Sequence, residues 1–292
     1  MQLARTVADL RRATTGWRAS AERIGLVPTM GALHAGHMTL VDAARAACDR
    51  VVVSIFVNPK QFGPADDLTA YPRPESADLE MLRAAGADLA FLPGADEVYP
   101  PGFATLIHVG GLGEGLCGAH RPGHFDGVAT VVAKLLIEVQ PDIAYFGEKD
   151  YQQLLLVRRL ARDLDLPVEI AGVPTVREAD GLAMSSRNAY LSPGERRLAP
   201  SLARVLQSIA AALAAEPGAV SRELARGRAE LEAAGLAVEY LEIRDSEALT
   251  PVTIEIAADS RVFAAVRLGR TRLIDNLPIC RAEGEDKSCP RG

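Results

Sequence analysis

The sequence of 292 residues contains little cysteine and few aromatic residues, with four cysteines, one tryptophan and 5% Phe, Trp and Tyr together. The cysteines lie far apart, which excludes a dense disulfide scaffold and predicts free thiols, as in a reducing cytoplasm. No apolar run approaches the length of a membrane span. The first 20 residues lack the apolar segment of a secretory signal and instead predict an amphipathic helix. We therefore expect a cytoplasmic protein with no membrane partner.

The chain also has no excess of basic over acidic residues. The 32 Lys and Arg residues are outnumbered by 38 Asp and Glu residues, which gives a net charge of −6. The chain therefore has no overall basic surface for nucleic acid, and any anionic ligand must be held by a local site. The length and the apolar fraction of 48% fit two domains, or one large α/β domain with an appendage.

The first half of the chain alternates short β-branched runs with helical patterns. This alternation predicts a Rossmann-like parallel sheet with helices on both faces. Strands are expected at 24–29, 50–57, 87–93, 141–147 and 167–175, and the main helices between them at 36–49, 125–140 and 149–165.

After about residue 176 the composition changes. Two Ala- and Arg-rich helical stretches, at 194–215 and 218–234, precede strand-like runs at 237–245, 252–258 and 260–276. Helices followed by strands, without alternation, indicate a smaller α+β domain. We thus expect a Rossmann-like domain over 1–176, a C-terminal α+β domain over 177–281 and a polar tail over 282–292.

Polar side chains follow several predicted strands at the point where each strand ends. Parallel sheets bind ligands beyond these carboxyl ends. The loops there read "TMGALHAGH", "NPKQF", "GEKD" and, after the last strand, "READGLAMSSRN". They combine glycines with His, Lys, Arg, Ser and Gln, which are suited to holding phosphate.

The first of these loops carries two histidines, His34 and His37, at the expected start of a helix. The N–H groups and the dipole of a helix N-terminus attract an anion, and Gly31 and Gly36 allow close backbone approach. A protonated or N–H-donating imidazole would stabilise charge on a phosphate. A short H-x-G-H pattern also fits an ordinary surface turn, but its place directly after the first strand of a βαβ unit favours function.

The other loops are less specific. Lys149 offers a point charge for a polyphosphate, although "GEKD" also fits a solvated helix start. "MSSRN" gathers hydroxyl and guanidinium donors but could be a polar linker. Gln61 is uncharged and suits a small polar substrate, although an exposed loop amide fits equally.

A competing site lies in "CGAHRPGH", where Cys117, His120 and His124 have spacing that resembles part of a zinc site. No nearby Cys or His supplies a fourth ligand. We therefore favour a Gly-rich loop over a metal site.

Taken together, the motifs resemble the pantothenate synthetase (pantoate–β-alanine ligase) family of the H-x-G-H nucleotidyltransferase superfamily. The resemblance runs from about residue 24 to 280 and rests on several motifs in order: "PTMGALHAGH", "FVNPKQF", "YPR", "RPGHFDGV", "YFGEKDYQQ" and "MSSRNAYLS".

The resemblance implies an ATP-dependent, AMP-forming ligase of pantothenate and coenzyme A biosynthesis. Pantoate would attack the α-phosphate of ATP to give pantoyl adenylate and pyrophosphate. The amine of β-alanine would then attack the adenylate and release AMP. The family further implies a homodimer, and a C-terminal domain that closes as a lid.

The same resemblance assigns roles to residues. His37, as the acid, together with His34, Lys149 and Arg187 would be catalytic, and Gln61 and Gln153 would bind pantoate, with Gln61 also near β-alanine. Mg²⁺ would accompany the ATP phosphates, with Asp78 as a candidate to help hold it. ATP would contact Met30, Gly31, Ala32, Leu33, His34, Ala35, Gly36, His37, Gly147, Glu148, Lys149, Asp150, Val176, Met184, Ser185, Ser186 and Arg187.

Two other functions remain open from the residues. A nucleotidyltransferase with a phosphorylated acceptor would share the histidine loop, but glutamines in "NPKQF" and "YQQ" favour a substrate with carboxylate and hydroxyl groups. A nucleotide sensor with an inactive site is disfavoured by the intact His34, His37 and Lys149. Size and acidity disfavour a tRNA synthetase.

Overall fold

The computed structural model describes residues 1–63, 68–256 and 259–280. The chain divides into two compact units, Met1–Val176 and Arg177–Gly292. Each unit has a hydrophobic core of its own. The expected tail at 282–292 lies outside the described residues.

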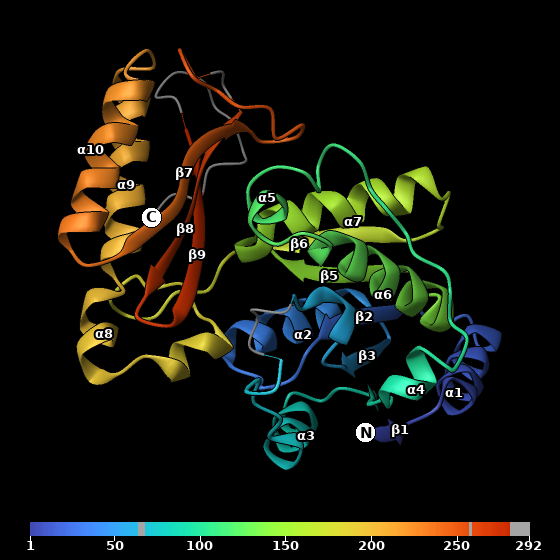
Figure 1. The fold of residues 1–292 in the computed structure, drawn as a ribbon. Helices are drawn as coiled ribbons and strands as arrows, with labels where there is room; N and C mark the ends of the chain where they lie inside the picture. The colour runs from blue at the N-terminus through green and yellow to red at the C-terminus, as the bar shows by residue number, and fades with distance from the viewer. Residues whose placement is uncertain (64–67, 257–258, 281–292) are drawn as a thin grey trace. The chain divides into compact units, whose positions relative to one another are not determined.

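The first unit is built on a six-stranded parallel sheet (Figure 1), which confirms the predicted fold class. Its strands stand in the order β1-β4-β3-β2-β5-β6. They are β1 (Gln2–Ala4), β2 (Ile24–Thr29), β3 (Arg50–Ile55), β4 (Leu89–Phe91), β5 (Ile143–Gly147) and β6 (Glu169–Val173).

Helices flank this sheet (Figure 1), since each connection between parallel strands must cross over one face. They are α1 (Val7–Ala19), α2 (Ala35–Ala47), α3 (Glu75–Ala84), α4 (Ala95–Val98), α5 (Cys117–His120), α6 (His124–Val139) and α7 (Tyr151–Asp163), with 3₁₀ turns η1 (Pro59–Gln61) and η2 (Glu148–Asp150).

The strand sequences are almost uniformly apolar because the sheet is covered on both faces. In β3, Val51, Val52 and Val53 are all buried, and successive side chains point to opposite faces. Val51 and Val53 share one core cluster with Val41 of α2 and Leu82 of α3.

The strand order identifies where a ligand would bind. From β2 the chain adds β3 on one side, and it later returns to add β5 on the other side of β2. The loops after β2 and β5 therefore leave the sheet in opposite directions, which opens a crevice at their carboxyl ends. These are the loops that carry the two histidines and "GEKD".

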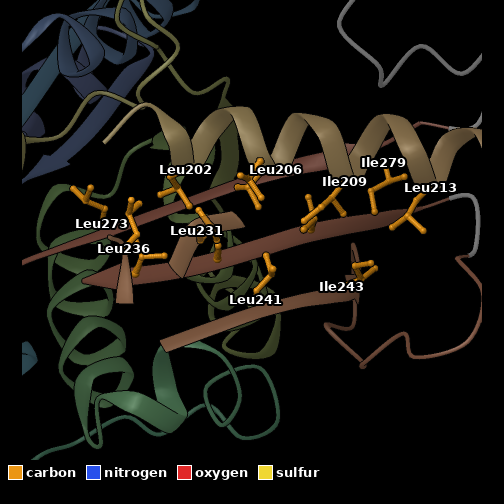
Figure 2. Packing of buried hydrophobic residues seen from close by; sticks show 14 of the residues in the cluster. Leu202, Leu206, Ile209, Leu213, Leu231, Leu236, Leu241, Ile243, Leu273 and Ile279 are labelled. Atoms are coloured by element: carbon orange, nitrogen blue, oxygen red, sulfur yellow. The ribbon is translucent and has the colours of Figure 1, made fainter. Parts of the chain in front are cut away.

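The second unit pairs an antiparallel sheet with helices. Its sheet has the order β7-β8-β9. In Figure 2, Leu202, Leu206, Ile209 and Leu213 project from α9 toward the sheet, spaced three or four residues apart as one helix face requires. The elements are η3 (Ser186–Tyr190), α8 (Pro193–Leu198), α9 (Ser201–Ala215), α10 (Val220–Ala233), β7 (Ala237–Asp245), β8 (Ser260–Leu268) and β9 (Thr271–Ile279).

Several expected elements differ from the structure. The first residues form the edge strand β1, which pairs with β4, before helix α1 begins. The predicted strand at 252–258 is wrong over residues 252–256, which form no strand. A single β-bridge forms nearby, between Arg244 and Pro251, and the side chain of Ile254 is 81% exposed. Residues 257–258 lie outside the described residues. The run at 260–276 is a hairpin, because Gly269, with φ of +56°, turns the chain between β8 and β9.

Two expectations about the whole chain also need correction. The stretch Pro193–Ala215 is long and apolar enough to cross a membrane by length and composition, contrary to the expectation of no such run. Helix α9, which lies within this stretch, packs its apolar face in the core of the second unit. Core helices of soluble proteins can have the same length and apolar composition as a membrane span. Cys48 and Cys117 carry reduced thiols, whereas Cys280 is disulfide-bonded, so the expectation of four free thiols is wrong.

Candidate active site

The two histidines form the N-terminal cap of α2. The Nδ1 atom of His34 accepts from the N–H of Gly36 at 3.1 Å, and the Nδ1 atom of His37 accepts from the N–H of His34 at 3.3 Å. The two rings lie 4.1 Å apart between centroids. Because each Nδ1 acts as an acceptor, the proton of each neutral ring lies on Nε2. The first turn of α2 contains no acidic residue that would repel an anion.

The charge state of His37 follows from its surroundings. Burial, then the neighbouring His34 and then Lys149 lower the pKa of His37 from 6.5 to about 3, against the opposite effect of Asp150. His37 is therefore neutral at pH 7 and is an N–H donor. Of the two states considered from the sequence, this favours the N–H-donating one over the protonated one.

The loop before the histidines takes a left-handed turn that Asp78 holds in place. Gly31 and Ala32 have φ of +82° and +50°. The carboxylate of Asp78, on α3, accepts from the N–H groups of Ala32 and Leu33, each at 2.8 Å. A Cβ at Gly31 would lie 2.9 Å from this carboxylate, so glycine is needed there.

This geometry bears on the metal role considered for Asp78. The residue is 2% exposed, and each of its oxygens already accepts a backbone N–H. Among the described residues, no group of three or more His, Cys, Asp or Glu side chains is placed to hold a metal ion. Asp78 therefore supports the histidine loop in this structure.

The loop after β3 places Gln61 beside the first loop. Gln61 is buried at the end of η1, and its Nε2 atom lies 3.2 Å from Sδ of Met30. Its Oε1 accepts from Nδ2 of the buried Asn58 at 2.9 Å. The sequence gives no sign that Asn58 is linked to Tyr99 and Gly127, because these two partners lie 41 and 69 residues further along the chain.

Helix α6 approaches this loop unusually closely. A Cβ at Gly127 would lie 2.3 Å from the carbonyl oxygen of Lys60 and 2.6 Å from the nitrogen of Gln61. The carbonyl of Gly127 also accepts from Nδ2 of Asn58 at 3.0 Å. Because Gly127 has no side chain, η1 can pack directly against the backbone of α6.

The loop after β5 brings Lys149 to the same edge. Lys149 lies on η2 with its Nζ atom 3.6 Å from Asp150, and its charge contributes to the lowered pKa of His37. Gln153 is half-buried in the first turn of α7. Its neighbour Gln152 is buried and supports the loop before α5, since its Nε2 atom donates to the carbonyls of Leu112 and Gly115, each at 2.8 Å.

The remaining predicted residues lie at the end of the first unit and in the second. Val176 ends the first unit. In the second, Ser185 caps η3 by accepting from the N–H of Arg187 at 3.3 Å. Met184 precedes this cap, and Ser186 opens the 3₁₀ turn.

The segment that carries these residues is anchored by charged side chains of its own unit. Glu178 accepts from Asn188 at 2.8 Å and from Arg196 at 2.6 Å. Arg177 makes a two-pronged pair with the buried Asp275, at 2.7 and 2.9 Å. These contacts hold both ends of the 177–188 segment.

The Cys-His-His spacing does not form a metal cluster in the part of the chain that the structure describes. Instead, Nδ1 of His124 lies 2.8 Å from the carbonyl of Gln61, and Arg121 lies within 3.3 Å of the same carbonyl. This loop therefore supports η1 from the side of α6.

Comparison with known proteins identifies relatives over nearly the whole chain. The family model described as pantoate-beta-alanine ligase matches residues 2–278. The pantothenate synthetase of Rhodospirillum rubrum is 54% identical over 280 residues, which cover 96% of this chain and 99% of that relative. The crystal structure of pantoate-beta-alanine (pantothenate synthetase) from Thermus thermophilus aligns with a TM-score of 0.90 and 51% identity, over 96% of this chain and 100% of that one.

One further solved structure contains ligands. It is the pantoate-beta-alanine ligase of Francisella tularensis, complexed with beta-gamma ATP and beta-alanine. It aligns with a TM-score of 0.80 and 32% identity, over 95% of this chain and 97% of that chain.

Proposed function

The chain belongs to the pantoate–β-alanine ligase family, and from this premise we propose that it condenses pantoate with β-alanine at the expense of ATP. The observation that carries the proposal is the histidine-capped N-terminus of α2, at the crevice between the loops after β2 and β5. A helix end without acidic residues, with two N–H-donating imidazoles and Lys149 nearby, is suited to a triphosphate.

ATP binding is assigned to the residues that the resemblance indicated. Met30–His37 and Gly147–Asp150 would line the phosphates in the first unit, and Val176 would contact the adenine side. Ser185, Ser186 and Arg187, preceded by Met184, would add donors from the second unit, which would act as a lid. The Nε2–H groups of His34 and His37 and the ammonium of Lys149 would stabilise the charge that grows on the phosphates.

The first chemical step forms a mixed anhydride. A carboxylate oxygen of pantoate bonds to the α-phosphorus, and the bond from that phosphorus to the bridging oxygen of the β-phosphate breaks. Pyrophosphate leaves with the electron pair of this bond. Gln61 and Gln153 would orient pantoate for this attack.

The second step transfers the acyl group. The neutral amine of β-alanine attacks the acyl carbon, AMP leaves with the electron pair of the C–O bond, and the nitrogen loses a proton to give the amide. For His37 to supply a proton in either step, the phosphate charge must first raise its low pKa. Without such a rise, His37 would stay neutral and would act on the phosphates only as an N–H donor.

Mg²⁺ would enter with ATP, because oxygen atoms of phosphates are its preferred ligands. The described residues contain no cluster of three or more candidate ligands, and both oxygens of Asp78 are engaged. The protein's contribution to the metal would therefore be small. When bound, the ion neutralises phosphate charge that the histidines and Lys149 would otherwise meet alone.

The remaining expectations are part of the same proposal. The enzyme would act in the cytoplasm as a homodimer, in the synthesis of pantothenate for coenzyme A, and on small molecules without nucleic acid or membrane. Gel filtration with light scattering tests the dimer, which would elute at twice the chain mass of 31.1 kDa.

The test of function is product analysis with ATP, Mg²⁺, pantoate and β-alanine. We expect AMP and pyrophosphate in equal amounts with pantothenate, each dependent on pantoate. ADP and phosphate would instead indicate an acyl phosphate. Nucleotide transfer to a phosphorylated acceptor, without amide formation, would support the nucleotidyltransferase alternative.

A further inference from the structure

A chain of hydrogen bonds leads from Tyr99 to the amide of Gln61. The hydroxyl of Tyr99, which directly follows α4, donates to Oδ1 of Asn58 at 2.7 Å. Nδ2 of Asn58 then donates to Oε1 of Gln61 at 2.9 Å. Asn58 is 1% exposed, so water does not readily replace a lost partner.

The partners of Asn58 fix the direction of its amide. Its Oδ1 faces the hydroxyl of Tyr99 and the N–H of Lys60, at 2.7 and 3.3 Å. Its Nδ2 faces the carbonyl of Gly127 and Oε1 of Gln61, at 3.0 and 2.9 Å. Reversing the amide would set donor against donor at Lys60 and acceptor against acceptor at Gly127.

The direction of the Gln61 amide follows from that of Asn58. Because Oε1 accepts from Asn58, the NH₂ group of Gln61 points the other way, where Sδ of Met30 lies at 3.2 Å. Gln61 therefore offers an N–H donor at the site, which suits an acceptor oxygen such as a carboxylate or hydroxyl of the substrate.

Tyr99 supports the same 3₁₀ turn through its ring as well. The Nζ atom of Lys60, on η1, lies 5.1 Å from the centre of the Tyr99 ring, within the range of a cation–π contact. The ring also packs edge-on against Phe103, with centroids 5.0 Å apart. Burial and the nearby Glu138 raise the pKa of Tyr99, so its hydroxyl stays protonated and remains a donor.

We propose that Tyr99 is a positioning residue for the acidic substrate: its hydrogen bond to Asn58 helps to hold the Gln61 amide in the place and direction in which its N–H faces pantoate. This inference rests on the proposed function. In this proposal the hydroxyl acts on the substrate only through the side chains of Asn58 and Gln61. Of the substrates, pantoate therefore depends on Tyr99 and ATP does not.

The test is Tyr99→Phe, which keeps the ring and the Lys60 contact but removes the hydroxyl. We expect the KM for pantoate to rise about tenfold, while the KM for ATP changes less than about twofold, because a buried acceptor loses its shortest hydrogen bond. Tyr145→Phe is the matched control, since Tyr145 is buried in β5 and its hydroxyl makes one long hydrogen bond, to Cys48 Sγ at 3.8 Å, among the described residues. That variant should leave both KM values unchanged.

A double variant distinguishes a positioning role of Tyr99 from a general loss of structure. In Gln61→Ala, adding Tyr99→Phe should cause no further loss in kcat/KM for pantoate, because the amide through which Tyr99 acts is gone. Additive losses, or equal changes in the two KM values for Tyr99→Phe, would overturn the proposal. If the unmodified protein consumed no ATP in a pantoate-dependent way, the proposed function itself would fail, which is a distinct outcome.

Discussion

Replacing Gly127 by alanine should damage catalysis without touching a catalytic side chain. The added Cβ would lie 2.3 Å from the carbonyl oxygen of Lys60, whereas ordinary contacts begin at 3.4 Å. Because α6 is 16 residues long and largely buried, whereas η1 has three residues, we expect η1 to move away by roughly 1 Å. A displacement of that size at a positioning residue can cost about 100-fold in rate, and we expect kcat/KM for pantoate to fall by about that factor.

The measurement is initial-rate kinetics at saturating ATP and β-alanine, together with a denaturant titration. Overpacking should cost about 1–3 kcal/mol, partly offset by about 1 kcal/mol from the better helix propensity of alanine. Gly16→Ala is the control, because Gly16 lies inside α1 and a Cβ there would meet no atom within 4 Å beyond its chain neighbours and the helix's own backbone. It should gain about 0.5–1 kcal/mol in stability and keep full activity. Full activity in Gly127→Ala would refute the idea that this contact places Gln61.

Three more outcomes are expected. Asp78→Ala removes both carboxylate oxygens that accept from the left-handed turn, so the Kd for ATP, measured by calorimetry, should rise about 10-fold or more. Glu75→Ala, on the same helix, should leave this Kd unchanged. Unchanged ATP binding in Asp78→Ala, with an altered Mg²⁺ requirement, would assign Asp78 to the metal instead. NMR titration should show His37 neutral down to about pH 4, with a higher pKa once ATP is bound. Because its folded pKa lies below the unfolded 6.5, its contribution to stability is complete above pH 6.5 and is lost as the pH falls toward 3; a native pKa near 6.5 would contradict this. Leu206→Ala should lower the unfolding free energy by about 2–5 kcal/mol in urea titrations, and Leu198→Ala, at an exposed position, by far less; equal effects would show that the α9 face is not the core.

The positions of the polar loops could be predicted because buried parallel strands have a strong local signal. The apolar run at 24–29 coincides with β2, and the histidines follow it directly. Strand β1 was missed because three residues are too few to show a period, and it gains its stability from pairing with β4.

The supports of the site could not be predicted in the same way. Tyr99 and Asn58 are 41 residues apart, and Asp78 is 46 residues from Ala32. Neither pair has a local pattern, since only the packing of the whole unit brings the partners together. The segment 252–256 shows the opposite error: its β-branched residues have high strand propensity, but in the described structure it forms no strand, and Ile254 is exposed although Ile256 is buried in the core.

The use of two imidazoles as a helix cap has a consequence for recognising inactive relatives. Serine followed three residues later by glutamate closes a helix with the same reciprocal hydrogen bonds. A chain that carried this pair in place of His34 and His37 would keep helix α2 and its fold, but it would place a carboxylate where we propose that the phosphates of ATP bind. Such an exchange would therefore identify a relative that has lost the ligase activity but has kept the fold.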